Sequence, residues 1–175
     1  MLAKDCTVGL TQERLKALLH YDPATGIFTW VGSKSRRVKN GSRADRPNDK
    51  GYRVLKIGER VFYCHRLAWL YTTGAWPTDR VDHINLDKGD CRWANLRAAT
   101  FAENLRNRGP NKNTKSGLKG AYRKHDALRA KPWSSAIHVG GKVIHLGTFS
   151  TPEEANAAYR EAAVKHFGQF ARSAA

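Results

Sequence analysis

The spacing of apolar and polar residues predicts short helices alternating with short strands in the first third of the chain. A helix is predicted from residue 11, because three leucines repeat at helical spacing: Leu15, Leu18 and Leu19. A turn at 22–26 and a strand at 27–30 follow. Residues 32–50 are polar and basic and contain glycine and proline, so they predict a long loop.

The middle of the chain predicts a hairpin, a helix and then a second pair of strands followed by a helix. The hairpin joins strands at 51–57 and 60–64 through a Gly-Glu turn, and the helix at 65–73 is ended by Gly74. The later elements are strands at 81–84 and 95–99, a polar loop at 85–90 and a helix at 100–108.

The last third of the chain has a different pattern, which predicts a three-stranded sheet and one long helix. The strands are expected at 120–124, 133–139 and 143–149. The helix begins at the capping box Thr151–Glu154 and ends at Gly168. Its repeating alanines would let it lie close against the sheet. The predicted fold class is therefore α+β, with a first domain at 1–108, a basic linker at 109–117 and a second domain at 118–175.

Charge narrows the classes of partner. The 31 Lys and Arg residues against 15 Asp and Glu residues give a net charge of +16 and a pI near 10.2. A surface of this charge favours a polyanion, of which nucleic acid is the commonest. No basic amphipathic helix is predicted, so a membrane surface is a poor alternative, and no run of 18 apolar residues suggests a transmembrane helix. The N-terminus lacks the apolar stretch of a signal peptide, which predicts a cytoplasmic protein of a bacterium or of a phage-infected cell.

The basic residues are concentrated in two segments. Residues 34–53 carry eight basic and two acidic side chains, and residues 105–131 carry nine basic and one acidic side chain. Residues 62–104, in contrast, carry five of each sign. This distribution predicts that the two basic segments hold DNA phosphates and that the neutral middle segment has a different role. The candidate phosphate contacts in and beside these segments include Arg36, Arg37, Lys39, Arg106 and Arg108.

The neutral middle contains residues suited to phosphodiester hydrolysis. Asp82 and His83 end a predicted strand, Asn95 lies twelve residues past His83, and Asn104 lies twenty-one past it on the following helix. A neutral imidazole is the natural base for taking a proton from water at neutral pH. A hard divalent cation, held by carboxylate and amide oxygens, stabilises the charge that develops on the phosphate. Because neighbouring side chains of a regular strand point to opposite faces, the strand has to end or bulge for Asp82 and His83 to serve one phosphate.

Residues 80–108, which read RVDHINLDKGDCRWANLRAATFAENLRNR, are similar to the HNH homing-endonuclease family in its Asp-His…Asn…Asn form. Upstream segments such as DPATGIFTW and HRLAWLYTTGAWP resemble phage members of that family, so the resemblance covers about 15–108. It implies a two-stranded ribbon and helix around one Mg²⁺ or Mn²⁺ ion, in a phage or mobile-element setting. By position, Asp82 and Asn104 would bind the metal, His83 would be the general base, and Asn95 would brace the loop between the strands.

Residues 117–171 resemble the APETALA2/ethylene-response-factor DNA-binding domain, mainly through the pattern LGTF…EEA…AY…AA. In that family the sheet lies in the major groove of double-stranded DNA. The resemblance implies that one set of side chains faces DNA: Lys119, Tyr122, Lys124, His138 and His145, with Arg123 as a near neighbour. Ile137, Leu146 and Phe149 would face the helix. Several arginines and tryptophans of the family are replaced, for example by Ala136 and Val143, which leaves the target sequence open.

The sequence therefore predicts a metal-dependent DNA endonuclease directed by its C-terminal domain, without a small-molecule cofactor. Two alternatives stay open: a DNA-binding regulator with an inactive nuclease module, and a protein that binds or cuts RNA. The histidine that precedes the predicted helix at 65–73, His65, is interpreted as a packing residue. The three cysteines are odd in number and widely spaced, so neither a disulfide framework nor a cysteine zinc site is expected. The oligomeric state and the cutting pattern are open.

Overall fold

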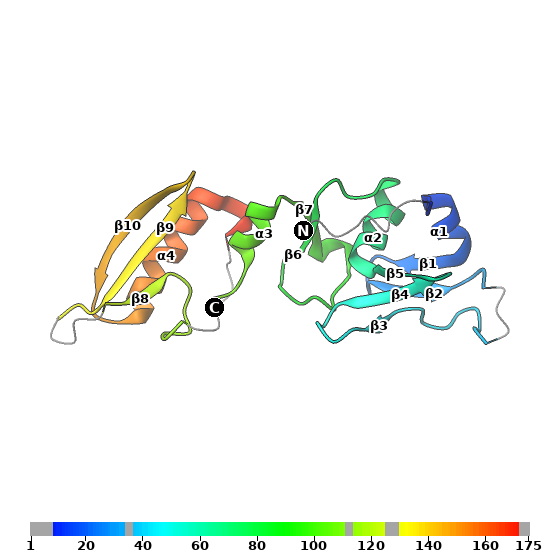
Figure 1. Cartoon of the computed structure of the whole chain (residues 1–175), viewed down its shortest axis with the longest axis horizontal. Coiled ribbons are helices and arrows are strands. Elements are labelled where there is room, and N and C mark those ends of the chain that lie inside the picture. Colours follow the sequence, from blue (N-terminus) through cyan, green and yellow to red (C-terminus); the bar gives the residue numbers. More distant parts are fainter. Residues whose placement is uncertain (1–8, 34–36, 111–113, 125–129, 172–175) are drawn as a thin grey trace. The chain divides into compact units, whose positions relative to one another are not determined.

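The computed structural model describes residues 9–33, 37–110, 114–124 and 130–171, and shows a mixed arrangement of helices and small antiparallel sheets (Figure 1). Contacts between Cα atoms group the chain into two compact units, Met1–Phe101 and Ala102–Ala175. This division falls inside the helix α3 (Phe101–Asn107). The functional division predicted from the sequence, with a linker at 109–117, stays a prediction.

The first unit begins with helix α1 (Gln12–Leu18), which starts where the sequence predicts because the Thr11 hydroxyl accepts a hydrogen bond from the Arg14 N–H. Strands β1 (Leu19–Asp22) and β2 (Ile27–Trp30) then form a hairpin. Strands β3 (Arg46–Pro47), β4 (Arg53–Ile57) and β5 (Arg60–Tyr63) form a three-stranded sheet. Helix α2 (Cys64–Thr73) follows and ends at Gly74 in a left-handed conformation.

Two predictions for this unit are wrong in detail. Leu19 belongs to strand β1 and not to the first helix, because its backbone is extended and pairs with Trp30 of β2. The segment 32–50 is not loop throughout, since Arg46 and Pro47 form β3 against β4. Strand pairing, which periodicity in one segment cannot reveal, decides both cases.

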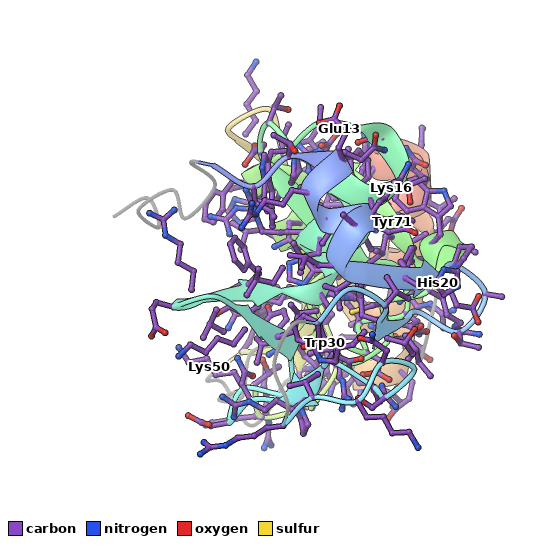
Figure 2. The ribbon with its side chains drawn as sticks, turned by 90° about the vertical axis from the view of Figure 1, so that its right-hand side faces the viewer. Glu13, Lys16, His20, Trp30, Lys50 and Tyr71 are labelled. Atoms are coloured by element: carbon purple, nitrogen blue, oxygen red, sulfur yellow. The ribbon has the colours of Figure 1, made fainter. Side chains whose placement is uncertain are left out.

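The apolar core of the first unit lies between α1, α2 and the sheets, and it includes Leu15, Phe28, Leu55 and Leu67. Figure 2 shows Lys16 of α1 beside Tyr71 of α2, with the ammonium 5.2 Å from the ring centroid. The two helices therefore share contacts at the surface as well as in the core.

The turn between β1 and β2 packs against the loop that joins two later strands, Arg80–His83 and Leu96–Ala99. Gly26 has φ +74°, and a Cβ atom there would lie 2.5 Å from the backbone N of Arg92. The Tyr21 hydroxyl donates to the Cys91 carbonyl at 2.7 Å, and the Trp93 N–H donates to the Pro23 carbonyl at 3.0 Å. Glycine is therefore needed for the close approach that holds residues 91–93 in place.

Strands β6 (Arg80–His83) and β7 (Leu96–Ala99) form a separate two-stranded antiparallel sheet in the first unit. A loop and a single 3₁₀ turn at Trp93–Asn95 connect them. The sequence predicts both strands within a residue at each end. This hairpin carries most of the residues expected at the catalytic site.

The second unit contains the predicted three-stranded sheet and its helix (Figure 1). Strands β8 (Ala121–Arg123), β9 (Trp133–Val139) and β10 (Lys142–Phe149) are antiparallel, in the order β10-β9-β8. Helix α4 (Pro152–Phe167) packs against all three strands. Its N-terminus is capped as predicted, because the Thr151 hydroxyl accepts from the Glu154 N–H at 3.2 Å.

Strand register decides which side chains of this sheet face the helix. Ile137 is buried with 1% exposure and packs with Leu146 and Ala163, so these residues form the core beneath the sheet. Tyr122 pairs with Ser134, and His138 pairs with Val143, on the opposite face. Gly120 makes a further close approach possible, because a Cβ atom there would lie 2.2 Å from the Tyr159 ring.

No helix in the described part of the chain is long and apolar enough to span a membrane.

Candidate functional site

The hairpin of β6 and β7 places Asp82 and His83 at the end of a strand but on different faces. Asp82 pairs with Arg97 and His83 with Leu96, in a register without a shift. Side chains alternate along such a strand, so the two residues have different neighbours. Strand β6 ends at His83, where the Leu86 N–H donates to the His83 carbonyl at 3.0 Å and turns the chain. The two side chains are therefore adjacent in sequence and buried, with 4% and 6% exposure, but no bulge brings them to one face.

Asp82 forms a buried ion pair with Arg97. The guanidinium Nε and Nη2 atoms donate to the same carboxylate oxygen, Oδ2, at 3.0 Å and 2.7 Å. The side chains are only 5% and 12% exposed. In such surroundings the attraction between the charges is much stronger than at a wet surface. The carboxylate expected to bind a metal thus already has a cation beside it.

His83 lies in a group of aromatic rings. The His65 ring from α2 meets it edge to face with centroids 4.9 Å apart, and the Tyr52 ring lies 6.1 Å from it. Burial lowers the pKa of His83, whereas the negative charge of Asp82 acts in the opposite direction. An imidazole with a lowered pKa is neutral at pH 7, which is the form needed to accept a proton.

His65, in the first turn of α2, is buried, with 8% exposure. Burial lowers its pKa to about 3, and the neighbouring His83 and Arg66 add to the effect. Its Nδ1 atom is buried and has no hydrogen-bond partner among the described residues. The packing role inferred from the sequence is compatible with this burial, but the contact with His83 gives His65 a place at the candidate site.

Asn95 connects the two ends of the loop between the strands. Its Oδ1 atom accepts a hydrogen bond from the Asn85 N–H at 3.0 Å, and its Nδ2 atom donates to the Asp90 carbonyl at 2.9 Å. The Asn85 amide also donates to the Asp90 carboxylate at 2.8 Å. These hydrogen bonds hold the two ends of the loop together, and the role of Asn95 in a catalytic site stays a prediction.

The Asp90 carboxylate is held in turn by Arg92, whose Nε and Nη2 atoms donate to its two oxygens at 2.8 Å and 2.6 Å. Hydrogen bonding to Arg92, opposed in part by burial, lowers the pKa of Asp90 to about 2. The loop that follows His83 is therefore held by a network of polar side chains as well as by the apolar packing of Cys91 and Trp93.

Asn104, the second metal ligand expected from the sequence, lies on α3 in the second unit. Its position relative to Asp82 and His83 therefore stays a prediction. Within residues 9–33, 37–110, 114–124 and 130–171, no three or more His, Cys, Asp or Glu side chains are grouped so that they could hold a metal ion. Cys64 and Cys91 are buried free thiols, and Cys6 lies outside the described residues.

A comparison with known protein families gives a match in the segment that contains Asp82 and His83. Residues 62–106 match a family model described as HNH endonuclease. The match spans α2, β6 and β7 and includes Asp82, His83, Asn95 and Asn104. It supports an HNH nuclease whose substrate is DNA. No curated protein matches the chain, and no solved structure matches it.

The residues expected to contact DNA from the C-terminal sheet differ in their surroundings. Tyr122 is 52% exposed, and His138 and His145 are exposed on the face of the sheet opposite α4. Arg123 is exposed and pairs with Trp133 at the end of β8. Lys124 is half-buried just after the strand, where its N–H donates to the Pro132 carbonyl at 2.8 Å.

Lys119 has internal partners. Its ammonium donates to the Arg106 carbonyl and, at 2.8 Å, to the Arg108 carbonyl, so it ties the end of α3 to the start of the sheet. The Arg106 guanidinium lies 4.6 Å from the centroid of the Phe167 ring. In this conformation both residues stabilise the second unit, and their contacts with DNA stay predictions.

The remaining basic candidates among the described residues lie outside the strands and helices. Arg37, Lys39 and Arg108 are exposed, and Arg36 lies outside the described residues. Three neighbours of the candidate site were not identified from the sequence as parts of it: Tyr52, His65 and Arg97. Arg97 lies in the strand predicted at 95–99, but its pairing with Asp82 depends on the register of β6 and β7, which the sequence does not show.

Proposed function

We propose that this protein is a metal-dependent DNA endonuclease in which His83 is the general base. The observation that carries the proposal is a buried imidazole with a lowered pKa at the end of β6, next to a carboxylate, inside the stretch that matches HNH endonucleases. His83 takes a proton from the attacking water, and hydrolysis leaves a 5′-phosphate and a 3′-hydroxyl. Asn95 keeps the loop after His83 in shape through its two hydrogen bonds.

Asp82 and Asn104 are proposed to hold one divalent cation, Mg²⁺ or Mn²⁺. The donor chemistry fits a hard cation, since carboxylate and amide oxygens are its preferred ligands. The cation, when bound, stabilises the negative charge that develops on the phosphate and on the leaving oxygen. Two protein ligands bind such an ion weakly, so phosphate oxygens of DNA complete its coordination.

The C-terminal unit is proposed to direct the enzyme by placing β8–β10 in the major groove of double-stranded DNA. Support comes from the exposed face that carries Tyr122, His138 and His145, and from the net charge of +16. A mobile-element or phage setting, with a homing role, is part of the same proposal.

The test is conversion of supercoiled plasmid to nicked or linear DNA, with Mg²⁺ and with EDTA. Wild type should cut only with Mg²⁺, and His83→Ala should abolish cutting while leaving the affinity for DNA nearly unchanged. Lys124→Ala should do the opposite, weakening binding and lowering the slope of log K against log[salt] by about 1. This division of roles would be contradicted if His83→Ala lost affinity for DNA and still cut the DNA that it binds at the wild-type rate.

A DNA-binding regulator without nuclease activity is the second candidate. The ion pair between Asp82 and Arg97 favours it, because it occupies the carboxylate that a metal needs. Tight DNA binding without cutting on any substrate, with either Mg²⁺ or Mn²⁺, would support the regulator.

A further inference from the structure

The ion pair between Asp82 of β6 and Arg97 of β7 differs from the pair that Asp90 and Arg92 form in the loop between these strands. Arg92 and Asp90 form a close pair at 2.6 Å, but the Arg92 side chain is 54% exposed and water screens it. The Arg97 side chain is 12% exposed and the Asp82 side chain 5% exposed. The Arg97–Asp82 pair is therefore held in surroundings of low polarity, where removing either charge leaves the other poorly compensated.

The geometry also makes the Arg97 guanidinium a direct competitor for a metal. Its Nε and Nη2 atoms both donate to Oδ2 of Asp82, within 3.0 Å. A Mg²⁺ or Mn²⁺ ion bonds a carboxylate oxygen at about 2.1 Å, so it would lie within about 5 Å of the guanidinium. Two cations this close in a poorly solvated site repel each other strongly. The carboxylate can hold one of them well, but not both.

We propose that Arg97 is a positioning residue of the candidate nuclease site, which keeps the divalent cation off Asp82 until DNA is bound. The inference rests on the proposed function, in which Asp82 is a metal ligand. The guanidinium holds the carboxylate in the free protein and transfers to a DNA phosphate when the duplex arrives. Guanidinium groups bind phosphate through two parallel hydrogen bonds, so phosphate offers Arg97 a partner at least as good as Asp82.

This exchange has two measurable consequences. Metal binding and DNA binding become coupled. A bound DNA phosphate draws Arg97 away from Asp82 and so frees the carboxylate for the metal, and a bound metal releases Arg97 for the phosphate. Replacing Arg97 by a neutral residue of similar shape should then raise metal affinity in the absence of DNA. An arginine outside the site should have no such effect, and Arg92, which pairs with Asp90 in the same loop, is the matched control.

The experiment is isothermal titration of the full-length chain with Mn²⁺, for wild type, Arg97→Gln and Arg92→Gln. We expect Arg97→Gln to bind Mn²⁺ about tenfold or more tightly than wild type, with Arg92→Gln unchanged. The double variant Arg97→Gln/Asp82→Asn should lose this gain, which assigns the site to Asp82. Equal or weaker binding by Arg97→Gln than by wild type would overturn the proposal.

A second titration needs no change at Arg97 and keeps the proposal testable if Arg97→Gln fails to fold. A chain with His83→Ala, which we expect to leave DNA intact, is titrated with Mn²⁺ with and without a short duplex. The duplex should tighten Mn²⁺ binding about tenfold, and equal affinities would count against the exchange. Tighter Mn²⁺ binding by Arg97→Gln, together with no cutting of any DNA substrate by wild type, would support the competition at Asp82 and reject the nuclease. The two failures are therefore distinguishable.

Discussion

The rings of His65 and His83 meet edge to face, with centroids 4.9 Å apart and planes inclined by 75°. His65 comes from the first turn of α2 and His83 from the end of β6, and both side chains are less than 10% exposed. A ring in this position limits the orientations that the His83 imidazole can adopt.

We expect His65→Ala to slow plasmid cutting by about 10- to 100-fold with little change in DNA affinity, because a loosely held base spends less time in the reactive geometry. His65→Phe keeps a ring against His83 and should retain most of the rate. Single-turnover cutting assays on both variants, with urea unfolding to compare their stability, provide the measurement. Equal rates for His65→Ala and wild type would show that His83 does not need this contact.

Asn95→Ala should destabilise the first unit by about 1–3 kcal/mol, because it removes two hydrogen bonds and leaves the Asn85 N–H and the Asp90 carbonyl unpaired. Asn95→Asp should be almost as harmful, since a carboxylate oxygen would face the Asp90 carbonyl. Urea unfolding gives the free energies. Asn40, which accepts one hydrogen bond from the Ser33 N–H in an exposed loop, is the matched control, and Asn40→Ala should cost clearly less. A similar cost at both positions would contradict a bracing role for Asn95.

Asp90 should make the stability of the protein depend on pH in the acid range. Its pKa is lowered to about 2 in the folded chain by hydrogen bonding to Arg92, from an ordinary value of 3.8. A carboxyl group with a lowered folded-state pKa stabilises the fold above the unfolded pKa, and this contribution is lost as pH falls from about 4 to about 2. Wild type should therefore lose more stability than Asp90→Asn over that interval, as measured by thermal unfolding. Parallel curves for the two proteins would rule out this contribution.

Ser135→Ala should leave the second unit equally stable or more stable by about 1 kcal/mol, because the Ser135 hydroxyl is buried beneath the sheet without a hydrogen-bond partner among the described residues. Ser134→Ala, on the opposite face of the same strand, is the control and should change little. Thermal unfolding of the two variants provides the comparison. A clear loss of stability in Ser135→Ala would mean that the hydroxyl has a partner in solution.

Much of the local structure follows from patterns within single segments. The capping box at Thr151–Glu154, the helix-ending Gly74 and the hairpin turn at 58–59 each act through neighbours in the chain, so the sequence predicts them closely. Leu19 was predicted in a helix and residues 46–47 in a loop, but both are in strands, because their conformations depend on partners in other segments.

For the candidate site, the sequence by itself determined which residues have suitable chemistry, since the spacing of Asp82, His83, Asn95 and Asn104 is a property of the chain. Only the tertiary structure decided which side chains surround them. Arg97 meets Asp82 through the register of β6 and β7, and His65 meets His83 because α2 packs against β6. Strand register and helix packing are set by the burial of the whole first unit, and no single segment contains that information.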